Sequence, residues 1–293
     1  MKFVRKRRLA FFLLSLSITG IYVDAQNSVK VASGQTNIQY DHKIFGQFIE
    51  HFDNQVYGGI FEPGSPLSDE KGFRKDVIEA LKDIKTGIVR WPGGCFASTY
   101  HWMDGIGKDR QPTYDKTWQV EDPNTFGTDE FVEWCRRIGA EPFICTNAGT
   151  GTPEEMSDWM EYCNLNVGKF GRMRKENGHT EPYNVKYWEI DNEQWEFGIE
   201  KYEACVRLFS EEMRKIDPTI KIIVCGGFDD EDFFKRSGNY FDYVSLHHYE
   251  QQGGYATGPK RLGEQYDKYA QMIADCPNPN IKLFISEWNL QSI

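Results

Sequence analysis

The sequence predicts a parallel α/β fold, because short strand-like segments alternate with helix-like segments along most of its length. Seven apolar segments are too short for helices and run into polar residues, and amphipathic segments with capping signals lie between them. In parallel α/β folds, polar residues at the carboxyl ends of strands meet at the edge where ligands bind. The length of 293 residues suits one α/β barrel or two smaller domains.

The first half of the chain contains three strand-and-helix units. The predicted strands are Ile44 to Ile49, Thr86 to Trp91 and Pro142 to Thr146. Val77, Leu81 and Ile84 mark the first helix, Thr128 is the expected N-cap of the second, and Thr152-Pro153 opens the third with a capping box and a proline at its first position. Residues 95 to 127 form a long connection, and connections of this length inside a domain are usually functional.

The second half continues the same alternation. Its strands are Val185 to Ile190, Ile220 to Cys225, Tyr243 to Leu246 and Ile281 to Ser286, and the helices between them are predicted around Tyr202 to Ile216, Glu231 to Lys235 and Leu262 to Ile273.

The number of strands is one short of a complete barrel, in which the last strand must pair with the first. Only six residues follow Glu287 (293 − 287 = 6). Unpaired backbone groups on two buried edge strands would cost about 1 to 3 kcal/mol each. We therefore expect an incomplete barrel with seven of eight strands, belonging to a longer protein. The alternative is an open seven-stranded sheet covered by another element.

The composition is that of a soluble globular protein, with 40% hydrophobic and 27% charged residues. Lys and Arg number 34 against 44 Asp and Glu, and the net charge of −10 argues against nucleic acid or an anionic membrane as a partner. The seven cysteines and six histidines are scattered, without a C-x-x-C pair, so a metal site or a disulfide framework has little support. No metal and no organic cofactor is expected.

The first 25 residues resemble an export signal. A basic segment from Lys2 to Arg8 precedes an apolar run from Leu9 to Ile18, and Ala25 offers a small residue for cleavage before Gln26. An uncleaved anchor is the alternative, but the run is shorter than the roughly 20 residues that span a bilayer. We expect a periplasmic or secreted protein cleaved after Ala25, with an N-terminal extension over 26–42 and a barrel over 43–293.

Two glutamates in matching contexts are the candidate catalytic residues. Glu193 follows one predicted strand directly after Asp191 and Asn192, and Glu287 follows another in Ser-Glu-Trp-Asn. Two carboxyl groups on either side of a glycosidic bond are what its hydrolysis needs, and a separation of about 5 to 5.5 Å would make one a nucleophile and the other an acid that later acts as a base. Glu193 also has a structural alternative, because asparagine and glutamate both suit a helix N-terminus. Asp191 either adds a negative charge that raises the pKa of Glu193 or is a structural partner of a lysine or arginine.

Several ordered motifs together make the sequence similar to glycoside hydrolase family 51, the retaining α-L-arabinofuranosidases. The motifs are Phe48-Ile49-Glu50-His51, Tyr57-Gly58-Gly59-Ile60, Arg90-Trp91-Pro92-Gly93-Gly94, His101-Trp102-Met103-Asp104-Gly105-Ile106-Gly107, Phe126-Gly127-Thr128-Asp129-Glu130-Phe131, Asn192-Glu193 and Glu287-Trp288-Asn289. The match runs from about residue 43 to 289. The resemblance implies a (β/α)8 TIM-type barrel.

The resemblance also implies roles for single residues. Glu193 matches the acid/base and Glu287 the nucleophile, and six further positions match residues that line the furanose pocket: Glu50, Arg90, Cys95, Asn192, His247 and Tyr249. Arg90 has the alternative of pairing with a buried carboxylate, and His247 that of a structural histidine. The chain departs from the family at Asp191, where a small residue is more usual, and in having no eighth strand and no C-terminal β-sandwich.

The function expected from this resemblance is release of terminal α-L-arabinofuranosyl residues from arabinose-containing plant polysaccharides or oligosaccharides. The alternatives are another enzyme of the same clan acting on xylan or β-glucan, and a non-catalytic carbohydrate-binding or inactive fragment. Neither nucleic acid nor, after signal cleavage, a membrane is an expected partner, and assembly into a homo-oligomer is left open.

Overall fold

The structure, a computed structural model, describes residues 39–194, 198–227, 230–251 and 254–291. The predicted signal peptide and residues 26–38 of the predicted extension lie outside these ranges. Contacts divide the chain into two units, Met1–Gln39 and Tyr40–Ile293, and all the elements below lie in the second.

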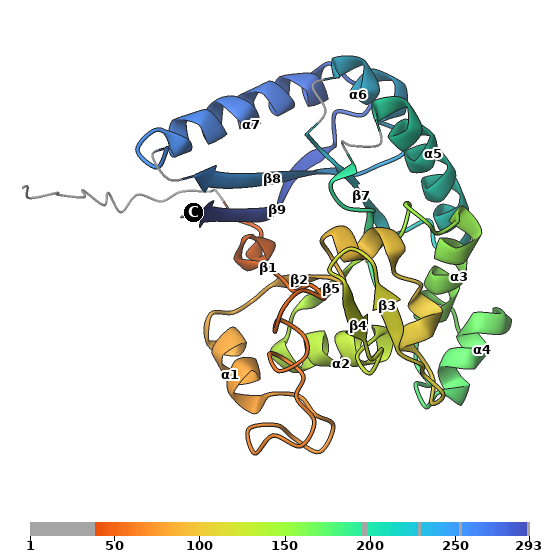
Figure 1. Cartoon of the computed structure of the whole chain (residues 1–293). Coiled ribbons are helices and arrows are strands. Elements are labelled where there is room, and N and C mark those ends of the chain that lie inside the picture. The colour runs from red at the N-terminus through yellow and green to blue at the C-terminus, as the bar shows by residue number, and fades with distance from the viewer. Residues whose placement is uncertain (1–38, 195–197, 228–229, 252–253, 292–293) are drawn as a thin grey trace, which may run out of the picture. The chain divides into compact units, whose positions relative to one another are not determined.

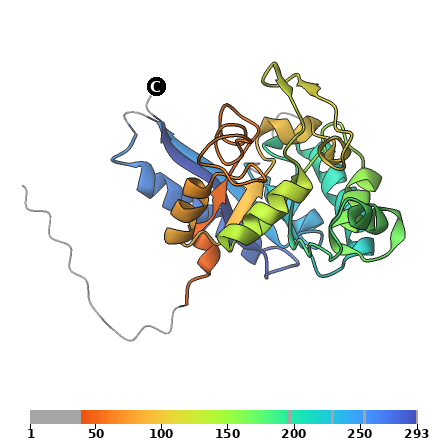
Figure 2. The same cartoon turned by 90° about the horizontal axis from the view of Figure 1, so that it is seen from below.

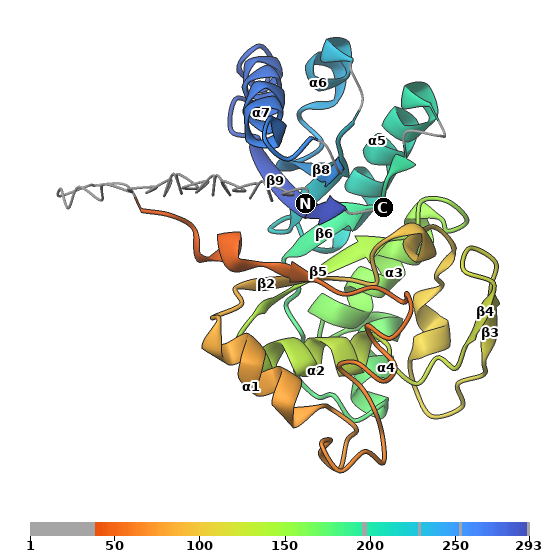
Figure 3. The same cartoon turned by 60° about the vertical axis from the view of Figure 1, so that its left-hand side comes forward.

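Seven parallel strands form one sheet that curves into a nearly closed barrel, as the sequence predicts (Figure 3). Their order in the sheet is their order in the chain: β1 (Gln47–Phe48), β2 (Ile88–Trp91), β5 (Glu141–Thr146), β6 (Tyr187–Ile190), β7 (Lys221–Cys225), β8 (Tyr243–Gln251) and β9 (Lys282–Gln291). Among the described residues no ladder joins β1 to β9, so the barrel stays open between them.

The helices lie on the outer side of the curved sheet (Figures 1 and 2). They are α1 (Lys75–Asp83), α2 (Thr128–Ile138), α3 (Pro153–Asn164), α4 (Gly168–Glu176), α5 (Ile199–Ile216), α6 (Glu231–Ser237) and α7 (Gly258–Ala274). The predicted cap of α3 is confirmed, because the Thr152 hydroxyl accepts a hydrogen bond from the Glu155 amide at 3.1 Å. The predicted cap of α2 is wrong: Gly127 is the N-cap, and Thr128 instead accepts a bond from the Trp159 indole at 3.0 Å. The sequence did not predict α4.

The prediction for the first strand is corrected, and the long connection holds elements that the sequence did not predict. The segment predicted as a strand from Ile44 to Ile49 begins inside a 3-10 helix, η1 (His42–Phe45), and holds only the short β1, which among the described strands pairs with β2 alone. The connection over 95–127 holds two 3-10 helices, η2 (Cys95–Thr99) and η3 (Trp102–Gly105), and a hairpin of β3 (Thr113–Asp115) and β4 (Val120–Asp122).

Strands β8 and β9 run past the predicted ends at Leu246 and Ser286, and pair with each other as far as Gln251 and Gln291. The ladder has a bulge, because Leu246 pairs with Ile285 whereas His247 pairs with Glu287. A bulge turns an extra side chain toward the same face of the sheet. Here the bulge lets the side chains of Ser286 and Glu287 both reach the polar groups in the barrel interior.

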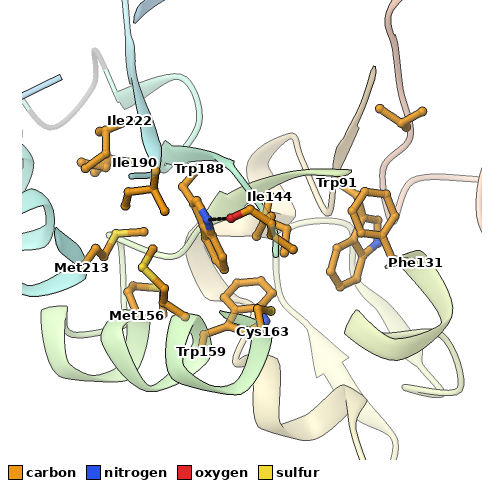
Figure 4. Close-up of a cluster of buried hydrophobic side chains, with 14 of the residues drawn as sticks. Trp91, Phe131, Ile144, Met156, Trp159, Cys163, Trp188, Ile190, Met213 and Ile222 are labelled. Atoms are coloured by element: carbon orange, nitrogen blue, oxygen red, sulfur yellow. Dashed lines mark hydrogen bonds between the residues drawn. The ribbon is translucent and has the colours of Figure 1, made fainter. Parts of the chain in front are cut away.

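Buried aromatic and sulfur-containing side chains fill the layer between sheet and helices (Figure 4). Trp91 stacks on Phe131 with ring centroids 4.9 Å apart, and Trp159 meets Trp188 edge to face at 5.8 Å. A second cluster closes the barrel interior below the strand ends and draws one residue from each of six strands: Ile88, Phe143, Tyr187, Ile223, Tyr243 and Phe284. This apolar floor fixes the strands whose ends carry the polar residues described next.

A groove of about 1110 Å³ lies at the gap between β1 and β9. Its walls are mostly apolar, with Phe45, Phe48 and Phe284 among them, and it reaches the polar interior at Arg90 and Ser286. In the part of the chain that the structure describes, no helix combines the length and the apolar character needed to cross a membrane.

Candidate active site

The guanidinium of Arg90 is the centre of a buried polar cluster at the carboxyl ends of the strands. Arg90 is 1% exposed and donates to five side chains, one of which is Cys145, whose Sγ lies 3.8 Å from Nη2. Its Nε lies 2.6 Å from Glu189 Oε2, Nη1 lies 2.7 Å from Glu287 Oε1 and 3.4 Å from Glu50 Oε1, and Nη2 lies 2.5 Å from Asn192 Oδ1. Burial alone would lower the pKa of Arg90, but the surrounding negative charges, that of Glu189 first, raise it. One fixed cation therefore holds together groups on or directly after four strands, β1, β5, β6 and β9.

The two predicted catalytic glutamates meet beside this cation. A carboxylate oxygen of Glu193, one of Glu287 and a ring nitrogen of His247 all lie within 4.8 Å of one another. His247 Nδ1 is 2.7 Å from Glu193 Oε1 and 3.4 Å from Glu287 Oε1. The side chain of Glu193 is 29% exposed, whereas that of Glu287 is 7% exposed. Two close carboxyl groups thus have different surroundings, one accessible to water and one enclosed.

The bulge in the β8–β9 ladder supports this arrangement from below. Ser286 Oγ lies 2.9 Å from His247 Nε2 and 2.5 Å from Ser245 Oγ. Because each ring nitrogen of His247 has a different partner, the imidazole is held in one orientation between Ser286 and Glu193.

Three interactions keep Glu287 ionised despite its burial. Burial raises the pKa of a carboxyl group, but the charges of Arg90 and His247 and the hydrogen bond that Tyr249 donates to Oε2 at 2.8 Å lower the pKa of Glu287 below its usual value. Burial and the charge of Glu287 raise the pKa of Tyr249, so its hydroxyl remains a donor. A buried, ionised carboxylate in this position has the properties of a nucleophile.

Glu50 behaves differently in the same cluster. Burial raises its pKa to about 7, and the nearby charges of Glu287 and Glu193 add to this, although Arg90 acts against it. Near neutral pH this carboxyl group is partly protonated, so it can donate as well as accept hydrogen bonds.

Asp191 holds the loop that carries Asn192 and Glu193 in place by hydrogen bonds. It is fully buried with a positive φ of 62°, a conformation that favours glycine. Its carboxylate accepts bonds from Ser98 Oγ at 2.6 Å, from the Ala148 amide at 2.7 Å, from the Asn192 amide at 2.7 Å and from Gln194 Nε2 at 2.6 Å. Burial raises its pKa and these bonds oppose the shift. Of the two alternatives for Asp191, pairing with a lysine or arginine is therefore wrong, since all four donors are uncharged.

The turn after β2 brings the chain close to Glu50. Gly94 has a φ of 59°, and a Cβ atom at this position would lie no more than 3.0 Å from the carboxyl atoms of Glu50. Only glycine fits here without displacing that carboxyl group. Cys95, the next residue, begins η2 and is exposed, in contrast to the buried Arg90 and Asn192.

Most of the predicted site residues are thus joined by hydrogen bonds or ion pairs in one cluster: Glu50, Arg90, Asn192, Glu193, His247, Tyr249 and Glu287. Sequence reasoning missed Glu189, Ser245 and Ser286. Glu189 did carry a signal, because a charged residue inside a short apolar strand must face a polar partner.

Glu193, His247 and Glu287 are also the group of side chains among the described residues that lie close enough to hold a metal ion. The Arg90 guanidinium, 2.7 Å from Glu287 Oε1, already supplies a positive charge there. The acid and base chemistry of two carboxyl groups needs no metal.

A second pocket of about 470 Å³ lies between the β3–β4 hairpin and the residues after β1. The rings of Phe52 and Trp118 lie at its wall with centroids 4.4 Å apart, and both are partly exposed. His51, directly after Glu50, forms its inner side and bonds to Asp122 of the hairpin at 2.5 Å. The predicted functional role of the long connection stays a prediction.

Comparison with known proteins identifies relatives for most of this unit. Residues 80–271, more than half of the chain, match the family model described as the alpha-L-arabinofuranosidase 1 domain. A protein of Aspergillus clavatus named probable alpha-L-arabinofuranosidase C is 43% identical over 208 residues, covering 68% of this chain and 41% of that protein. The intracellular exo-alpha-(1->5)-L-arabinofuranosidase of Acetivibrio thermocellus is 34% identical over 280 residues, covering 86% and 56%.

Solved structures give the same result. The alpha-L-arabinofuranosidase of Thermotoga maritima in complex with arabinose matches with a TM-score of 0.79 and 42% identity, over 84% of this chain and 55% of that one. The thermostable GH51 enzyme of Thermotoga petrophila RKU-1 matches with a TM-score of 0.80 at the same identity and coverage. This chain spans about two fifths to three fifths of the length of these relatives.

Proposed function

The chain belongs to glycoside hydrolase family 51, the α-L-arabinofuranosidase family, and we propose on this basis that it releases terminal α-L-arabinofuranosyl units from arabinose-containing glycans with retained configuration. Plant polysaccharides and the oligosaccharides derived from them are the proposed substrates.

The proposed reaction has two steps. The Glu287 carboxylate attacks the anomeric carbon while Glu193 gives its proton to the leaving oxygen, so that a bond from Glu287 to the sugar forms as the glycosidic bond breaks. Glu193, now ionised, then takes a proton from water, whose oxygen attacks the same carbon and frees both arabinose and Glu287. Two inversions at one carbon give retention.

The separation of the two glutamates supports this proposal most directly. A gap of about 5 to 5.5 Å between carboxyl groups is typical of retaining glycosidases, whereas inverting enzymes need about 6.5 to 9.5 Å to admit a water molecule. Oxygens of Glu193 and Glu287 within 4.8 Å fit the shorter spacing. The lowered pKa of Glu287 and the exposure of Glu193 fit their respective roles.

The experiment compares the chain with Glu287→Ala and Glu193→Ala on an activated aryl α-L-arabinofuranoside. Glu287→Ala should lose turnover, and added azide should restore it with a glycosyl azide of inverted configuration. Glu193→Ala should keep the first step on a substrate with a good leaving group and lose the second. Undiminished turnover in either variant would contradict its assignment, and a panel with xylan and β-glucan oligosaccharides would reveal a different substrate class.

Export is part of the proposal. The basic segment, the apolar run and Ala25 support a cleavable signal over residues 1–25. N-terminal sequencing of the mature protein should begin at Gln26, and a chain that keeps Met1 after export would contradict cleavage.

A further inference from the structure

Glu189 is a buried acid that the proposed reaction does not use. It lies on β6, two residues before Asp191, and is 1% exposed. Its Oε2 accepts the Nε–H of Arg90 at 2.6 Å, and its Oε1 is buried without a hydrogen-bond partner. A buried carboxylate costs several kcal/mol unless it is well paired, so one unpaired oxygen at this depth calls for an explanation.

The geometry of the guanidinium explains why a carboxylate stands at this position. Arginine has five N–H donors in a rigid plane, one on Nε and four on the two Nη atoms. Because Glu189 takes the Nε, the plane is fixed from below, and the Nη atoms face Glu287 and Asn192. No other described hydrogen bond uses the Nε of Arg90.

We propose that Glu189 is a positioning residue for the reaction: it holds Arg90 in the one orientation that serves Glu287, and its negative charge limits how strongly Arg90 acts on that carboxylate. The role rests on the proposed function only in taking Glu287 as the reacting group. A carboxylate at Oε2 serves both purposes, and Oε1 needs no partner for either.

Other charged or titratable groups also face Arg90 and Glu287 from the elements packed around them. They are Glu50 after β1, Cys145 on β5, Glu193 after β6, and His247 and Tyr249 on β8. All stay unchanged when Glu189 alone is replaced, so a comparison of variants isolates its charge.

The test is a titration of Glu287 by carbon NMR, in the whole chain labelled at glutamate side-chain carboxyls, with the signal assigned through Glu287→Gln. Glu189→Gln keeps the shape and removes the charge, so the pKa of Glu287 should fall by about one unit, as expected for one charge several ångströms away. Glu189→Asp keeps the charge but draws Arg90 back toward β6, so the pKa of Glu287 should rise toward its ordinary value.

Asp129→Asn is the matched control. Asp129 is also a buried acid, but it bonds to Tyr162 and Tyr183, so its replacement should leave the Glu287 titration unchanged. A Glu287 pKa unchanged in both Glu189 variants, or moved equally by Asp129→Asn, would overturn the proposal, and the opposite shift of Glu189→Asp decides the case if Glu189→Gln does not fold. Because this readout needs no turnover, an inactive chain with the expected shifts would contradict the proposed function and still show that Glu189 positions Arg90 against Glu287.

Discussion

Replacing Asp191 by glycine separates two effects that oppose each other at the loop carrying the proposed acid. Glycine suits a φ of 62° better than aspartate, and relief of that strain contributes about 1 kcal/mol. The substitution also removes the acceptor of four donors, on Ser98, Ala148, Asn192 and Gln194. Each buried donor left without a partner costs about 1 to 3 kcal/mol. Since the side chains of Ser98 and Gln194 can rotate toward other acceptors, the two backbone amides decide the outcome, and we expect a net loss of about 1 to 5 kcal/mol.

For a domain of this size that loss corresponds to a melting temperature lower by roughly 2 to 20 °C. Urea unfolding followed by tryptophan fluorescence measures the loss in free energy of unfolding. Lys85→Gly is the matched control, because Lys85 has a similar φ of 57° but is exposed, and its replacement should stabilise the chain by about 1 kcal/mol or less. If Asp191→Gly unfolds at or above the urea concentration of the parent chain, the hydrogen bonds of Asp191 contribute less than its strain and the reasoning is wrong.

Three further predictions concern the cluster around Arg90. Arg90→Lys should lower kcat/KM for an aryl arabinofuranoside by about 100-fold or more, since one ammonium cannot replace a planar fork bonded to both Glu287 and Asn192; a loss under threefold would contradict this. Because the pKa of Glu50 is raised from 4.5 to about 7, ionising Glu50 destabilises the fold as pH rises through that window, by about 3 kcal/mol in full. Glu50→Gln should therefore weaken the fall in urea midpoint between pH 5 and pH 8, and an unchanged slope would refute the shift. Gly94→Ala should displace the Glu50 carboxyl and raise KM by about tenfold with a smaller effect on kcat, and unchanged kinetics would contradict the close approach.

The fold was predictable where local chemistry decides it. Period and length identified six of the seven strands, and the Thr152-Pro153 signal gave the start of α3 because that cap uses only neighbouring residues. The first strand was predicted too long, since an edge strand with one partner keeps only the residues that this partner pairs, and the pairing of Gln47 and Phe48 cannot be read from residues 44–49 alone.

The site was predictable in its members but not in its connections. Polar residues at strand ends pointed to Glu193 and Glu287, and the resemblance supplied Arg90 and His247. The bulge that places His247 beside Glu287 depends on the register between two strands nearly 40 residues apart, which no local pattern specifies. Glu189 was missed for a related reason: its partner comes from β2, and only the curvature of the sheet brings the two side chains together.

The central claim is that Glu287 forms a covalent bond to the sugar while Glu193 donates a proton to the leaving oxygen and later accepts one from water. An arabinofuranosyl donor with a 2-fluoro substituent and a good leaving group slows the second step, so the intermediate accumulates and can be located by mass spectrometry of peptides. The account predicts a single added 2-fluoroarabinosyl group on the peptide that contains Glu287, lost in Glu287→Gln. A label on another residue, or release of product with inverted configuration and no label, would contradict it.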